Sequence, residues 1–208
     1  FLEDRDGTDR IVRENVSVLK FIFEHMNRKE GETAIVLVGP RAMAQELAKE
    51  ASMLSTTNLS NLANKIRTAS DEVTPLVEEL IEVARKGVAF HHAGLTHRVR
   101  EYIEDLLNER KITTVVSTPT LSHGVDFPID HAIIYLDSFE FKKAIDDLTL
   151  FPSLSKIEYI QYRGRASRLM KSKGGNVYIV SDRIPRRTID TIRRNFLAKK
   201  IEDVFPPE

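Results

Sequence analysis

The chain has 208 residues, of which 41% are hydrophobic and 30% charged, so it is long enough for one sizeable globular domain or two small ones. No run approaches the roughly 20 apolar residues that cross a bilayer, so we expect no membrane partner. The absence of cysteine excludes disulfides, a thiol nucleophile and a Cys-ligated zinc site, and it favours an intracellular location, cytoplasmic or nuclear.

Charge is balanced in total but segregated along the chain. Lys plus Arg and Asp plus Glu each number 31, yet residues 161–200 hold twelve basic side chains against Asp182 and Asp190. Such segregation is typical of a protein with a basic face for an anionic partner such as nucleic acid, although order along the chain need not be order in space.

The predicted elements alternate between helices and short buried strands. Residues 8–28 have the spacing of a leading amphipathic helix. Apolar, β-branched runs predict parallel strands at 34–38, 87–90, 112–117, 132–136 and 176–181. Helical spacing is found at 41–54, at 74–87, which opens on Thr74-Pro75 and ends at Gly87, at 97–111, and in a basic closing segment, 183–200. This order predicts a doubly wound α/β domain with a mainly parallel sheet between two layers of helices.

Chemistry in such sheets collects at the loops that follow the strands. These loops are GPRAM (39–43), HHAGLTHR (91–98) and TPTLSHGVDFP (118–128), and the segment QYRGRASR (161–168) follows the fourth strand. Read as a helix, QYRGRASR places Gln161, Gly164, Arg165 and Arg168 on one stripe and turns Arg163 away. Such a stripe is either a solvated face or a phosphate site, and the stretch alone favours neither.

Taken in order, AIVLVGPR, FHHAGL, STPTLSHGVDFP and QYRGRASR resemble motifs IV, IVa, V and VI of the second RecA-like motor domain of superfamily two helicases, especially the superkiller-like, DExH-type branch. The resemblance implies a RecA-like motor domain over residues 1–200. The polar, Ser-, Thr- and Asn-rich stretch at 52–70 is interpreted from its composition as an inserted helix and loop, which could be a surface elaboration without catalytic consequence. The resemblance also implies a possible strand-separating hairpin at 137–158, with Phe139, Phe141 and Phe151 as candidate wedges. Residues 201–208 would be a linker to a missing segment.

The resemblance also assigns roles to residues. Arg165 and Arg168 match the motif VI arginines that face the γ-phosphate of ATP, with Arg168 the arginine finger, and Gln161, Gly124 and Asp126 match positions near the nucleotide. A guanidinium suits this task because it stabilises phosphoryl oxygens in a bidentate manner.

Four further residues match segments that run along a single nucleic-acid strand, either DNA or RNA. Thr118 matches the hydroxyl that holds a phosphate, and Arg41, His91 and His92 lie in segments along the backbone. Structural alternatives stay open: Thr118 or Asp126 could cap a turn, and either histidine could be a satisfied core residue. No carboxylate stands at ligand spacing from the histidines, so we expect no metal site here.

Two departures limit the resemblance. Ser167 replaces the glycine of the common GRAGR ending, which leaves the subfamily open, and the chain has neither a GxxxxGK[ST] loop nor a DExH or DEAD box. ATP and Mg²⁺ would therefore be bound mainly by a first RecA-like domain, and this chain alone should be inactive as an ATPase. The alternative is a non-catalytic RecA-like module that binds nucleic acid or protein.

Overall fold

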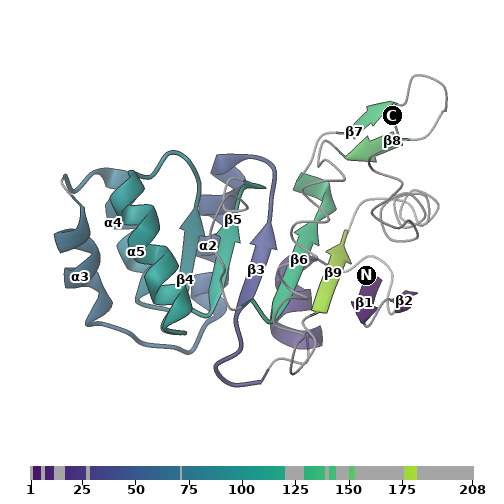
Figure 1. The fold of residues 1–208 in the computed structure, drawn as a ribbon, viewed down its shortest axis with the longest axis horizontal. Coiled ribbons are helices and arrows are strands. Elements are labelled where there is room, and N and C mark those ends of the chain that lie inside the picture. Colours follow the sequence, from purple (N-terminus) through teal and green to yellow (C-terminus); the bar gives the residue numbers. More distant parts are fainter. Residues whose placement is uncertain are drawn as a thin grey trace, which may run out of the picture.

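The computed structural model describes residues 2–5, 8–11, 17–26, 29–70, 72–119, 129–138, 141–143, 150–152 and 176–181 (Figure 1). The predicted closing helix at 183–200 and the predicted linker at 201–208 lie outside these residues. None of the described helices combines the length and the apolar character needed to cross a membrane.

Seven strands form the main sheet, in the order β2-β1-β9-β6-β3-β5-β4. Five of them are parallel neighbours: β9 (Asn176–Val180), β6 (His131–Tyr135), β3 (Ala34–Leu37), β5 (Thr114–Ser117) and β4 (Val88–His91). Every residue of β3, β4, β5 and β6 is buried, as expected for strands covered on both faces. The predicted strands and the parallel α/β architecture are confirmed.

The amino-terminal prediction was wrong in part. Thr8–Ile11 forms strand β2, which pairs antiparallel with β1 (Leu2–Arg5), and β1 pairs antiparallel with β9. The helix begins only at α1 (Val18–Lys20) and continues as a π-helical turn over Phe21–His25. Pairing with β9 satisfies the backbone groups of β1, and such a long-range partner leaves no trace in local helical periodicity.

Four longer helices surround the parallel strands: α2 (Arg41–Leu54), α3 (Leu62–Ala69), α4 (Pro75–Ala84) and α5 (His97–Asn108). Thr74 caps α4 by accepting a hydrogen bond from the Val77 N–H at 3.3 Å, ahead of a proline at the first helical position. Thr96 caps α5 in the same way through the Val99 N–H. The predicted helices at 41–54, 74–87 and 97–111 are therefore confirmed; the first has the predicted bounds, and the other two are shorter by one to three residues at their ends.

The helices lie in layers around the sheet. α2 lies behind the sheet in Figure 1 and α5 on the opposite side, as right-handed crossovers require, and α3 stands beyond β4 at the end of the layers. Within residues 52–70 a loop precedes α3, which packs against α4 and α5. A separate two-stranded antiparallel sheet pairs β7 (Phe141–Lys143) with β8 (Leu150–Pro152), Phe141 standing opposite Pro152.

A polar network joins the amino ends of β3 and β6. Asp130 Oδ2 accepts hydrogen bonds from the backbone N–H and the hydroxyl of Thr33, at 2.7 and 3.1 Å, and pairs with Arg110 at 2.6 Å. His131 Nε2 lies 2.9 Å from Glu32 Oε2. Partial burial by itself would raise the pKa of Asp130, but the Arg110 pair and the Thr33 hydrogen bonds outweigh it and hold that pKa below its usual value.

Candidate functional site at the carboxyl edge of the sheet

The carboxyl ends of β3, β4 and β5 lie level with one another. Ser117, the last residue of β5, stands opposite Leu37 of β3 on one side and opposite His91 of β4 on the other. The residues that follow these strand ends therefore meet at one edge of the sheet. This edge holds all four predicted backbone-contact residues: Arg41, His91, His92 and Thr118.

These four residues differ greatly in exposure. Arg41 opens α2 and is exposed, whereas His91 and His92 are each 1% exposed and Thr118 is 6% exposed. Direct contact with a bound strand is therefore open to the Arg41 side chain but not to the two imidazole rings as they lie. Burial of both rings is what the core-histidine alternative predicts, and their role at the edge stays a prediction.

His91 is held at both its ring and its carbonyl. Its Nε2 lies 3.0 Å from Glu104 Oε1 of α5, in a pair that is 1% exposed at the histidine and 17% at the glutamate. Its carbonyl oxygen accepts from the Thr118 N–H at 3.2 Å and from the Ser117 hydroxyl at 3.0 Å. The ring Nδ1 is buried and has no hydrogen-bond partner among the described residues.

His92 is fixed by three contacts. Its ring stacks on Phe90, with centroids 5.4 Å apart and planes 8° from parallel. Its Nδ1 accepts a hydrogen bond from the Gly94 N–H at 3.0 Å, so a neutral ring carries its hydrogen on Nε2. Gln45 Nε2 lies 3.0 Å from His92 Nε2. If His92 Nε2 carries the hydrogen, the Gln45 amide must be flipped so that Gln45 Oε1 accepts the hydrogen bond.

The electrostatics of the edge keep His92 neutral. Burial, followed by the electrostatic effects of the nearby Arg41 and His91 side chains, holds the pKa of His92 below its usual value. Arg41 therefore stands as an exposed cation beside an uncharged ring. The combination leaves the positive charge of this part of the edge on a guanidinium, which binds phosphate through two donors.

A second set of contacts connects the loop after β3 with those after β6 and β9. The Gly39 N–H donates to the Ser138 hydroxyl at 3.1 Å, and that hydroxyl donates to the Tyr135 carbonyl at 2.6 Å. The Ser181 hydroxyl donates to Asp137 Oδ1 at 2.8 Å. These hydrogen bonds connect the end of β6 with the loops that follow β3 and β9.

Sequence reasoning missed the residues that support the predicted ones: Gln45, Glu104, Ser117 and Ser138. Gln45 could have been found, because it lies one helical turn after Arg41 on the same face of α2. Glu104 gave no such signal, since it meets His91 only through the packing of α5 on β4.

The predicted nucleotide-facing residues lie outside the described part of the chain. These are Gly124, Asp126, Gln161, Arg165 and Arg168. The arginine stripe proposed from QYRGRASR therefore stays a prediction. Among the described residues, no group of three or more His, Asp or Glu side chains could hold a metal ion.

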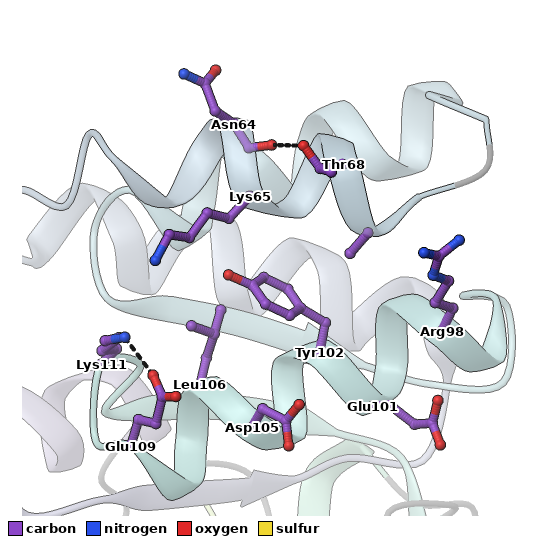
Figure 2. A pocket seen from close by; sticks show the side chains of 11 residues that line it. Asn64, Lys65, Thr68, Arg98, Glu101, Tyr102, Asp105, Leu106, Glu109 and Lys111 are labelled. Carbon is purple, nitrogen blue, oxygen red and sulfur yellow. Dashed lines mark hydrogen bonds and ion pairs between the residues drawn. The ribbon is translucent and has the colours of Figure 1, made fainter.

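A cavity of about 640 Å³ lies between α3 and α5 (Figure 2). Tyr102 stands at its centre, facing Lys65 of α3, above the floor formed by Leu106, and Lys111 pairs with Glu109 at one end. Burial raises the pKa of Tyr102, so its phenol stays protonated at neutral pH. None of the predicted site residues lines this cavity.

Comparison with known proteins identifies a helicase family and several related helicases. A family described as the helicase conserved C-terminal domain matches residues 58–170. Similar curated proteins are named "ATP-dependent DNA helicase Hel308". That of Pyrococcus horikoshii is 30% identical over 191 residues, 89% of this chain and 25% of the relative. That of Pyrobaculum calidifontis is 30% identical over 186 residues, 81% of this chain and 25% of the relative.

A third relative of the same name, from Thermoplasma volcanium, is 32% identical over 131 residues, 56% of this chain and 18% of the relative. The matches to these three relatives thus span a quarter of their length or less. The family match covers more than half of the chain, and the sheet it falls on has the parallel α/β order of a RecA-like domain. The chain therefore belongs to the helicase conserved C-terminal domain family of the superfamily two helicases.

Proposed function

We propose that the chain is the second motor domain of an ATP-dependent DNA helicase or translocase of the DExH type. The observation that carries this proposal is the family match over residues 58–170. The matched region includes β4 and β5, whose carboxyl ends bring Thr118 and the two histidines to one edge of the sheet. The substrate class comes from the relatives, which are named as ATP-dependent DNA helicases.

The carboxyl edge would grip the sugar-phosphate backbone of a single strand. Arg41 offers an exposed guanidinium, and Thr118, although only 6% exposed, places a hydroxyl just after the end of β5, a residue type that positions phosphates without reading sequence. His91 and His92 would act by shaping the loop between β4 and α5, since their rings are buried. Such a grip would be strong at low salt and indifferent to base sequence.

ATP would be bound between this domain and a first motor domain. Arg165 and Arg168 would present guanidinium groups to the transferring phosphoryl group, and Gln161, Gly124 and Asp126 would line the nucleotide. Because the sequence has no GxxxxGK[ST] loop, the cradle for the triphosphate and the Mg²⁺ ligands would come from the first motor domain. Closure of the two domains on ATP would then move the strand along the edge.

Binding of single-stranded DNA by the 208-residue chain tests the grip. Affinity should fall as salt rises, because phosphate contacts release counterions, and Thr118→Ala should weaken binding equally for unrelated sequences. Glu72→Gln, an exposed change in the connection that precedes α4, serves as control. Binding that does not depend on salt, or no binding at low ionic strength, would contradict the assignment of this edge.

ATPase measurements on the protein that carries both motor domains test the arginines. Arg168→Ala should leave ATP binding nearly intact and lower kcat by about 10³ to 10⁵, the range of arginine fingers. Arg168→Lys should rescue little, and Arg163→Ala should be close to silent. If Arg163 were essential for ATPase activity and Arg168 dispensable, the proposed helix register would be contradicted. If neither substitution changed the ATPase rate, the non-catalytic binding module would be favoured.

A strand-separating role is proposed for residues 137–158. Its support is the antiparallel pairing of β7 with β8, which stands apart from the main sheet. Deleting residues 149–153 in the two-domain protein should abolish unwinding and spare the ATPase stimulated by single strands. Equal loss of both activities would mean that the segment serves only the fold.

A further inference from the structure

His91 is a junction between β4, β5 and α5. Its carbonyl accepts from the Thr118 N–H at 3.2 Å and from the Ser117 hydroxyl at 3.0 Å, and its ring meets Glu104 at 3.0 Å. Thr118, the residue proposed to hold a phosphate, is therefore one hydrogen bond away from a residue that α5 holds in place. The sequence motifs assign no part to Glu104.

Glu104 is the polar anchor of the His91 ring. A carboxylate can only accept, so His91 Nε2 carries the hydrogen of this bond. The other ring nitrogen, Nδ1, is buried without a partner among the described residues. Removing the carboxylate would leave both nitrogens of a ring that is 1% exposed without hydrogen bonds, an arrangement that folded proteins avoid.

We propose that Glu104 is a positioning residue for the nucleic-acid edge: it fixes the His91 ring, and the His91 carbonyl in turn fixes Thr118. This inference rests on the proposed function, because it assigns a purpose to the rigidity of an edge that would hold a strand. A loosened Thr118 could still reach a phosphate, but ordering it at each encounter would cost affinity.

A merely structural role for Glu104 makes different predictions. α5 is already anchored in the core by four buried apolar residues: Val99, Ile103, Leu106 and Leu107. The helix also carries a second His–Glu pair, in which His97 lies 3.1 Å from Glu101. In that pair the His97 side chain is 76% exposed and the Glu101 side chain 61% exposed. Glu101→Ala is therefore a matched control on the same helix, with the same pair of residue types in water.

Amide hydrogen exchange of the 208-residue chain, followed by NMR, is the first test. Glu104→Ala should speed exchange at the Thr118 N–H by about tenfold, as expected for a local opening. The Ala34 N–H, bonded to the Thr113 carbonyl at the other end of the strands, should keep its rate. Glu104→Gln should restore protection, because the glutamine oxygen can accept from Nε2, and Glu101→Ala should change neither amide.

Affinity for a single-stranded oligonucleotide is the second test. Glu104→Ala should weaken binding by about threefold to tenfold, in the same direction as loss of a Thr118 contact, and Glu104→Gln should bind like the unmodified chain. ¹⁵N chemical shifts of the His91 ring should show hydrogen on Nε2 in the unmodified chain and in Glu104→Gln.

The outcomes separate the inference from the function on which it rests. If the unmodified chain binds no single strand, the proposed function fails, and the inference fails with it whatever exchange shows. If the chain binds but Glu104→Ala leaves Thr118 exchange or strand affinity unchanged, only the inference is overturned. Equal acceleration at Ala34 and Thr118, or a Glu104→Gln variant that behaves like Glu104→Ala, would also overturn it.

Discussion

Gly94→Ala should destabilise the domain by forcing the His92 ring out of its place. A Cβ built on Gly94 would lie 2.9 Å from both Cε1 and Nδ1 of that ring, closer than non-bonded carbon atoms approach. The ring has little room to retreat, because it stacks on Phe90 on one side and is tied to Gly94 and Gln45 through its two nitrogens. Either the backbone of the loop or the stacked pair must move.

The expected size follows from two opposing effects. Overpacking of a tight site costs about 1–3 kcal/mol, while replacing glycine by alanine at an ordinary backbone angle recovers about 0.4–1 kcal/mol by restricting the unfolded chain. The net loss in the free energy of unfolding is therefore about 1–2 kcal/mol, and for a domain of this size each kcal/mol lowers Tm by roughly 2–4 °C.

A double-mutant cycle shows whether the His92 ring is the cause. Urea unfolding would be measured for the unmodified chain, Gly94→Ala, His92→Ala and the double variant. With the ring removed, the alanine at 94 meets only an ordinary van der Waals contact with Leu76 Cδ2 at 3.9 Å, so its cost should vanish or change sign, which gives a coupling of about 1–3 kcal/mol. Additive effects of the two changes would refute the steric argument, because the penalty would then not depend on the ring.

Three further predictions concern the two edges and the core. Burial, then the electrostatic effects of Arg41 and His91, hold the pKa of His92 below its usual value of 6.5, so the unfolded chain binds this proton first as pH falls below 6.5. The free energy of unfolding should thus decrease from pH 7 toward pH 5, and His92→Gln should flatten that slope in urea titrations; equal slopes would contradict it. Partial burial opposes ionisation of Asp130, but Arg110 and Thr33 outweigh it and lower the pKa of Asp130 as well. The Asp130 carboxylate therefore stabilises the fold above pH 3.8, and this contribution is lost as pH falls through the folded-state pKa. Asp130→Asn should cost roughly 1.5–3 kcal/mol at neutral pH and much less in acid, as measured by thermal unfolding at both. Phe90→Ala should cost about 3–5 kcal/mol in urea unfolding, because this side chain is 1% exposed, and it should shift the NMR signals of the stacked His92 ring.

The sequence by itself determined the parallel core and the family. Apolar β-branched runs such as 34–38 and 112–117 predicted the strands, because a strand buried on both faces must be apolar along its whole length. Thr74 followed by Pro75 marked the start of α4, since a capping hydroxyl and a fixed φ act within a few residues. Each of these signals depends only on residues a few positions apart, so each can be recognised in the sequence without the tertiary structure.

Only the tertiary structure decided the supports of the candidate site and the form of the amino terminus. Glu104 and His91 are 13 positions apart in the sequence, and Thr33 and Asp130 are 97 apart. No periodic sequence pattern predicts contacts at such separations. Thr8–Ile11 became a strand because β1 adds to β9, a partner more than 160 residues away. The burial of His91 and His92 likewise follows from helices packed over β4, which no local pattern shows, and a role for either residue in holding nucleic acid stays a prediction.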